Sequence, residues 1–201
     1  CFVAVPNGKP LHTFPGTAPT AMPSKSEAPN PPDYRTARKA FIAACVQARA
    51  DAISRAHMGK SAPDGKPMFI DSVALGPREA KSAVLVIAND MSASIAVTAL
   101  LRDRVMVPEG MRLVVVHALD PFAFVKANGD RDWSHAMLKA IATEDLSRVT
   151  ALTILGFGIS KDELPAIFPT GRKVRLTCKL AKTPTNAAEM RESVSAELAR
   201  A

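Results

Sequence analysis

Aromatic residues, cysteines and long apolar runs are all scarce in this sequence of 201 residues. Aromatic residues make up 5% of the chain, with one Trp and one Tyr, so a core has to be built from aliphatic side chains. Three cysteines are too few for a disulfide scaffold, and they form no Cys-x-x-Cys pair that would hold zinc. No apolar run approaches the roughly 18 residues of a membrane-spanning helix, so we expect no such helix.

What remains is ordinary globular composition with a basic balance. Hydrophobic residues make up 47% of the chain and charged residues 22%, which argues against wholesale disorder. The net charge is +7, from 26 Lys and Arg against 19 Asp and Glu. A basic chain favours acidic partners such as anionic membrane surfaces, but its charge says nothing about its fold.

Proline divides the chain into two parts. Residues 1–33 contain eight of the sixteen prolines. Proline fixes φ and lacks the backbone donor, so this segment is predicted to be an extended arm and residues 34–201 a single domain. Phe2 and Phe14 are spaced along the arm as candidate anchors for a partner protein.

The start of the arm resembles a mature bacterial lipoprotein, in which a lipid-modified cysteine precedes such a segment. The resemblance implies lipid attachment at Cys1 and a membrane-anchored, periplasm-facing protein. The alternative is a fragment that happens to start at cysteine.

Hydrophobic periodicity predicts alternating strands and helices in the domain. The helices are expected at 34–57 (with Asp33 as N-cap), 92–105, 132–141 and 186–200, and the strands at 68–75, 83–88, 113–117, 149–157 and 172–180. The run from 83 to 117 is a βαβ unit. The predicted fold class is therefore α/β, a mostly parallel sheet flanked by helices.

Several landmarks between Tyr34 and about Leu138 carry a family resemblance. They are Tyr34–Phe41, Pro63-Asp64-Gly65, Leu75-Gly76-Pro77, Val84–Ile87, Ala99–Asp103 and Val116–Phe122. In order and spacing they resemble the N-terminal half of the DUF2817 proteins, a branch of the zinc carboxypeptidase (M14-like) superfamily. The resemblance implies a partial peptidase-like fold.

The same resemblance implies a decayed and truncated active site. Where the family carries a Gly-Thr-His-Gly-x-Glu-Gly loop with two zinc ligands, this chain has the shorter Ala88–Ser94, without His or Glu. His135-Ala136 stand where the family has its substrate-binding Asn-Arg. We therefore expect no catalytic residue, metal or cofactor. The residues expected in the vestigial cleft are Asn89, Asp90, His117, Asp120, Asn128, Asp130 and His135.

The remaining candidates have structural interpretations beside functional ones. His117 is expected to be a packed, hydrogen-bonded core histidine. Cys45 and Cys178 are expected to be buried thiols, with a disulfide left open. The basic tail, with Arg172, Lys173, Arg175 and Lys179, is interpreted as a solvated strand edge or as a docking surface for an acidic partner or anionic headgroups. No aromatic interleaving supports nucleic-acid binding.

Three functional hypotheses follow from these observations. The first is a non-catalytic, lipid-anchored scaffold or accessory subunit of a membrane-associated periplasmic complex, of respiratory or dehydrogenase type. The second is a hydrolase or small-ligand-binding protein with a rebuilt site in the former cleft. The third is a free-standing lipoprotein without a fixed partner. The first is the function that we predict from the sequence.

Overall fold

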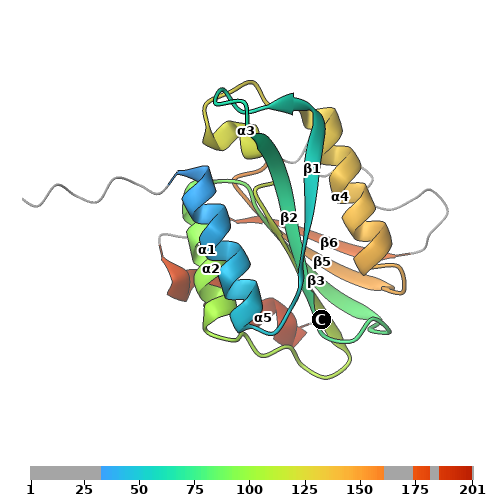
Figure 1. Ribbon diagram of the computed structural model, residues 1–201. Coiled ribbons are helices and arrows are strands. Elements are labelled where there is room, and N and C mark those ends of the chain that lie inside the picture. Colours follow the sequence, from blue (N-terminus) through green and yellow to red (C-terminus); the bar gives the residue numbers. More distant parts are fainter. Residues whose placement is uncertain (1–32, 161–173, 182–185, 201) are drawn as a thin grey trace, which may run out of the picture. The chain divides into compact units, whose positions relative to one another are not determined.

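The computed structural model describes residues 33–160, 174–181 and 186–200. The chain divides into Cys1–Pro31 and a compact unit, Pro32–Ala201, to which all described residues belong. The elements are α1 (Tyr34–Gln47), β1 (Ala52–Ser61), β2 (Pro67–Leu75), β3 (Ser82–Ala88), α2 (Met91–Arg102), β4 (Met111–His117), α3 (Pro121–Phe124), α4 (Arg131–Asp145), β5 (Ala151–Phe157), β6 (Arg175–Ala181) and α5 (Ala187–Arg200) (Figure 1).

The six strands form one sheet in the order β1-β2-β4-β3-β5-β6. Strands β4, β3, β5 and β6 are parallel to one another. Strands β1 and β2 add an antiparallel hairpin at one edge, where β2 pairs antiparallel with β4. Strands β3 and β4, which the helix α2 connects, pair in parallel, as the βαβ pattern predicts. The predicted fold class, an α/β protein with a mostly parallel sheet, is confirmed.

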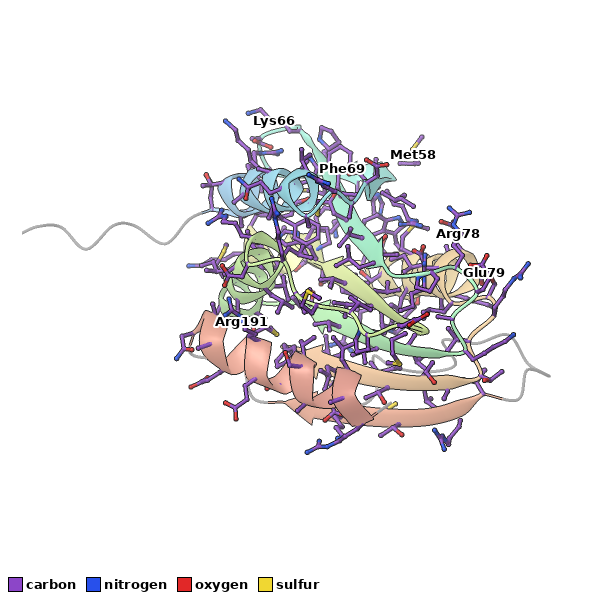
Figure 2. All side chains as sticks on the ribbon, turned by 90° about the horizontal axis from the view of Figure 1, so that it is seen from below. Met58, Lys66, Phe69, Arg78, Glu79 and Arg191 are labelled. Atoms are coloured by element: carbon purple, nitrogen blue, oxygen red, sulfur yellow. The ribbon has the colours of Figure 1, made fainter. Side chains whose placement is uncertain are left out.

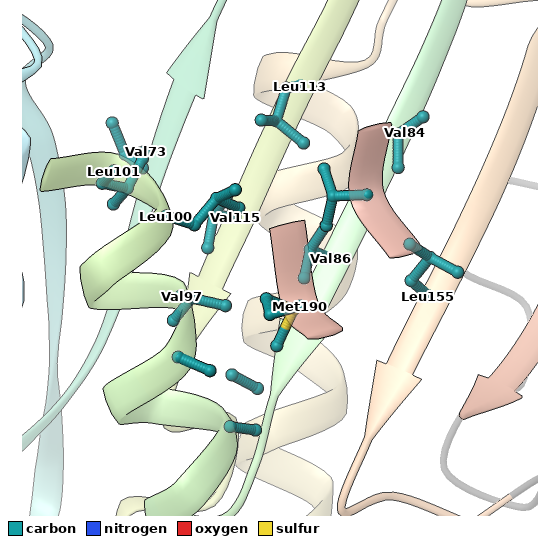
Figure 3. Close-up of a cluster of buried hydrophobic side chains, with 14 of the residues drawn as sticks. Val73, Val84, Val86, Val97, Leu100, Leu101, Leu113, Val115, Leu155 and Met190 are labelled. Atoms are coloured by element: carbon teal, nitrogen blue, oxygen red, sulfur yellow. The ribbon is translucent and has the colours of Figure 1, made fainter. Parts of the chain in front are cut away.

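Helices cover both faces of the sheet, and each face has its own core. On one face α1, α2 and α5 pack over side chains such as Val86, Val115 and Leu155 (Figure 3). On the other face α4 packs over Leu85, Val114 and Ile154. Successive side chains of a strand point to opposite faces, so a strand that is apolar at every position is covered on both. This explains the uninterrupted apolar sequence of β3.

Four helices begin with an aspartate as N-cap. Its carboxylate accepts a hydrogen bond from a backbone N–H of the first turn, a group without a partner inside the helix. The caps are Asp33 for α1, Asp90 for α2, Asp120 for α3 and Asp130 for α4. Three of these four residues are also members of the predicted vestigial cleft.

The prediction of one helix over 34–57 is wrong beyond Gln47. The helix ends at Ala48, Arg49 takes a left-handed φ of 57°, and residues 52–61 form β1, which pairs with β2. The sequence pattern does not reveal this strand, because the side chains that it directs toward α4 are polar. Arg55 pairs with Glu144, and His57 pairs with Asp130. Ion pairs replace the apolar alternation that marks a half-buried strand.

The other boundaries shift by a few residues. Helix α4 extends to Asp145, and the short helix α3 was not expected. Strand β6 begins at Arg175; Arg172 and Lys173 lie outside the described residues, as do Cys1, Phe2 and Phe14. Within the described ranges, we find no helix with the length and hydrophobicity to span a membrane.

Candidate functional site

The carboxyl ends of the three central parallel strands meet at one edge of the sheet, where open α/β sheets place their sites. Ala88, the last residue of β3, pairs with His117 of β4 and with Phe157 of β5. Asn89 follows β3, and Asp120 follows β4. The structure thus brings the first predicted cleft residues to the same edge.

Hydrogen bonds to the backbone engage these side chains. Asn89 accepts at Oδ1 from the backbone N–H of Asp120, with 2.6 Å between the atoms. Asp90 Oδ1 accepts from Ala93 N at 2.8 Å. Asp120 Oδ1 accepts from Phe122 N at 3.1 Å. The polar groups of this edge therefore connect loops and begin helices.

Two glycines pack against the carboxylates and leave little room beside them. Gly158 has a left-handed φ of 69°, and a Cβ there would lie 2.6 Å from Asp90 Oδ2. A Cβ on Gly129 would collide with Asp120 Oδ2. Of five cavities on the described part of the chain, none is lined by Asn89, Asp90 or Asp120.

Asp130 belongs to a second cluster, between β1 and α4. Its Oδ2 lies 3.0 Å from His57 Nε2, and its Oδ1 accepts from Trp133 N at 3.0 Å. These two hydrogen bonds hold the pKa of the Asp130 carboxyl below its usual value, and the bond from the Trp133 backbone has the larger effect. The His57 ring lies 4.6 Å from the Trp133 ring and meets Phe122 edge-on. These contacts join His57 of β1 to the start of α4 and to Phe122 of α3.

His117 lies in a third place, buried between the sheet and α1. Its ring stacks on Phe41 with 4.7 Å between centroids. Its Nδ1 is 4.0 Å from Asp71 Oδ2, and neither ring nitrogen has a hydrogen-bond partner among the described residues. Asp71, also fully buried, is held by Arg38 through two bonds of 2.8 and 3.0 Å and by Ser54.

Burial sets the protonation of this histidine. It lowers the pKa of His117 from 6.5 to about 4; the Asp71 carboxylate opposes that shift, and Arg38 reinforces it. His117 is therefore a neutral core side chain at physiological pH. The expectation of a packed histidine agrees with this position, but the expected hydrogen bond is missing within the described ranges.

The predicted cleft residues are thus not gathered into one site. Asn128 contributes its backbone carbonyl to Lys60, and His135, partly exposed on α4, has no hydrogen bond or ion pair to any described residue. No group of three His, Cys, Asp or Glu side chains in the described ranges is placed to hold a metal ion.

Two other sequence candidates also take different places from those expected. Cys45 is buried, and burial raises the pKa of its thiol to about 12. Cys178 is exposed on the edge strand β6, which corrects the expectation of a second buried thiol; both thiols are free. In the basic tail, Lys179 pairs with the buried Glu197 at 2.7 Å, whereas Arg175 is exposed.

The sequence analysis missed three buried or paired residues that organise the polar interior: Asp71, Arg38 and Arg112. A signal for two of them exists. Asp71 interrupts the apolar run of β2, and Arg112 is the second residue of β4, a strand that is buried along its whole length. A charge inside a buried strand requires a partner, which points to such a network.

Comparison with known proteins identifies a family for about half of the chain. Residues 32–131 match the model of the family described as "Protein of unknown function (DUF2817)". This confirms the resemblance found in the landmarks from Tyr34 to Leu138. No curated protein matches the chain.

Solved structures share parts of the architecture at low identity. Glutaminyl cyclase from Porphyromonas gingivalis gives a TM-score of 0.41 at 13% identity, covering 61% of this chain and 52% of that one. Glutaminyl cyclase from Macrostomum lignano gives a TM-score of 0.42 at 8% identity, covering 81% of this chain and 68% of that one. The LapA aminopeptidase of Legionella pneumophila gives a TM-score of 0.34 at 12% identity, covering 80% of this chain and 51% of that one. The chain spans about half the length of the first of these, and TM-scores this low identify no activity.

Proposed function

The chain belongs to the DUF2817 family through residues 32–131, and from this premise we propose that it is a non-catalytic accessory subunit of a membrane-associated complex. One observation carries the proposal. At the edge where an α/β enzyme holds its reacting groups, Asp90 and Asp120 serve as helix N-caps, and Asp130 caps α4 in the second cluster. The family's zinc loop is reduced here to the two residues between β3 and α2, Asn89 and Asp90.

The charge pattern supports docking on acidic groups. Arg175 is exposed on β6 and has no ion pair among the described residues. Lys179, also in the predicted docking set, neutralises Glu197, so Arg175 is the better candidate for contact with a partner subunit. Lipid attachment at Cys1 and a periplasmic location remain predictions, and the intact mass of the native protein would test them.

Conservative and non-conservative changes of the same carboxylates test the proposal. Asn and Ser cap helices about as well as Asp, whereas Ala costs about 1 kcal/mol per cap. Asp90→Asn and Asp120→Asn should therefore keep the free energy of unfolding within a few tenths of a kcal/mol, and the matched Ala variants should lose about 1 kcal/mol each. Urea denaturation measures both.

A catalytic role would show itself in turnover and not in stability. The purified full chain, with and without added Zn²⁺, is expected to hydrolyse neither amide nor ester substrates. Turnover that disappears in Asp120→Asn while its stability is unchanged would contradict the proposal and favour the rebuilt-site hydrolase.

A partner is tested in the cells that naturally carry the chain. Tagged protein purified from their membranes should retain a constant set of subunits, and Arg175→Glu should reduce their recovery. Arg131→Glu, a reversal of another exposed charge, is the control. Recovery of the chain as a monomer without subunits would contradict the accessory role.

A further inference from the structure

A cavity of about 390 Å³ lies at the end of the sheet opposite the carboxyl edge. It opens where β2 ends and β4 begins, since Leu75 pairs with Leu113 there. Three arginines, Arg49, Arg78 and Arg112, line it. They come from the α1–β1 turn, the β2–β3 turn and β4, and Figure 2 shows Arg78 projecting away from the ribbon. Three segments distant in sequence thus place guanidinium groups around one hollow.

Arg112 forms the floor of this cavity and retains an unused donor. It is 4% exposed. Its Nη1 donates to the Gly76 carbonyl at 2.9 Å, and its Nη2 to Asp145 Oδ1 at 3.2 Å. Its Nε–H has no acceptor among the described residues. Buried polar groups are almost always hydrogen-bonded, so an orphan N–H in a cavity wall points to an acceptor that comes from outside the chain.

The backbone around Gly76 fixes the position of that guanidinium. Gly76 has φ at 88°, and a Cβ there would collide with the Met111 carbonyl oxygen. Only glycine allows this close approach, which brings the Gly76 carbonyl to Arg112. The donor is therefore held in place before any ligand arrives, and a preorganised fork binds oxyanions best.

The charges that line the cavity leave a positive excess. Asp145 is already paired with Arg112. At the rim, Arg49 and Arg78 are exposed and have no ion pair or hydrogen bond from their side chains to the described residues, whereas Asp51 contributes one negative charge. Two uncommitted cations against one acid favour a ligand of negative charge.

Part of the remaining lining is apolar, beside the buried Ser72. Ile53, 44% exposed, pairs with Ser72, so it lies on the same face of the sheet as Ala74, which also lines the cavity. A bare inorganic anion would leave this apolar surface in water, whereas an aliphatic group would cover it. The cavity volume falls in the range of small-molecule sites.

We propose that this cavity binds a small organic acid, with its carboxylate on Arg112 and Arg78 and a short aliphatic chain against Ile53 and Ala74. The inference concerns the opposite end of the sheet from the helix-capping edge, and it does not depend on the proposed accessory role.

Backbone amide shifts of the full chain, titrated with hexanoate, test the proposal. Saturable shifts are expected at Ile53, Gly76 and Arg112. 1-Hexanol, which has the chain without the carboxylate, should give none, and inorganic phosphate should bind at least about fivefold more weakly. Arg78→Gln should weaken hexanoate about tenfold, as expected for loss of a charge-assisted contact.

Matched variants keep the result interpretable. Arg102→Gln removes an equally exposed arginine of α2 that does not line the cavity, so it should leave hexanoate affinity unchanged. Arg49→Gln gives a second rim variant, which avoids relying on the buried Arg112. Absence of saturable shifts, or equal losses in Arg78→Gln and Arg102→Gln, would overturn the proposal. Phosphate binding as tight as hexanoate would overturn its organic part.

Discussion

Acidification from pH 7 to pH 5 is expected to destabilise this fold through His117. The ring is completely buried, stacks on Phe41, and has no hydrogen-bond partner for either nitrogen among the described residues. Burial, as the largest cause, lowers the pKa of His117 from 6.5 to about 4. The nearby Asp71 does not rescue the charged form, because Arg38 already neutralises it.

The sign follows from proton binding in the two states. Below pH 6.5 the unfolded chain takes up a proton at this residue, whereas the folded chain does so only below about pH 4. The stability that depends on neutral His117 is therefore complete above pH 6.5 and is lost as pH falls from 6.5 to 4. The loss amounts to about 2 kcal/mol between pH 7 and pH 5, and about 3 kcal/mol once pH 4 is passed.

Urea denaturation followed by fluorescence of the single Trp133 measures this loss at each pH. His117→Leu replaces the ring with an apolar side chain of similar size. Between pH 7 and 5 its free energy of unfolding should fall about 2 kcal/mol less than that of the natural chain. Ile141→Val is the control: it removes one buried methylene and should cost about 1 kcal/mol at every pH. If His117→Leu and the natural chain lost equal stability on acidification, the reasoning would be refuted.

Two further predictions concern the polar interior and the β2–β3 turn. Arg38→Gln removes the cation that balances Asp71, so the pKa of His117 should rise, and NMR titration of the imidazole protons measures it; an unchanged pKa would contradict the network. Gly76→Ala should destabilise the chain by at least about 2 kcal/mol, since the strain of a left-handed φ and the collision with a backbone oxygen add. Gly110 also has a left-handed φ, of 76°, but a Cβ there would meet no atom within 4 Å, so Gly110→Ala should cost only about 1 kcal/mol. Urea denaturation measures both losses. Equal losses would mean that the collision costs nothing.

The sequence predicts the parallel part of the fold well, because burial on both faces leaves a clear signal. Strands β3 and β4 are apolar at nearly every position, and the helix between them carries an apolar face, so their pairing follows from the βαβ pattern. The antiparallel edge is different. In β1, Arg55 and His57 face α4 through ion pairs, and the pattern has no apolar alternation to read. Only the position of Glu144 and Asp130 in space explains these side chains.

The meeting of Asn89, Asp90 and Asp120 was predictable, but their hydrogen bonds and the separation of the other predicted cleft residues were not. That Asn89, Asp90 and Asp120 meet follows from their places after parallel strands. Their hydrogen bonds depend on where each helix begins, which the sequence fixes only to within a few residues: α2 was expected from Ser92 and starts at Met91. That single residue makes Asp90 the N-cap.

The short connection between β3 and α2 accounts for the role of Asp90 as a helix N-cap. Only two residues separate the end of β3 from the start of α2. In so short a connection the residue before the helix has to satisfy the N–H groups of the first turn, and Asp90 Oδ1 does so through Ala93 N at 2.8 Å. The other residue, Asn89, bridges to the β4 end through Asp120 N. A longer loop would leave side chains free of these duties and able to face a ligand. With two residues, this connection anchors the start of α2 through Asp90 and the β4 end through Asn89.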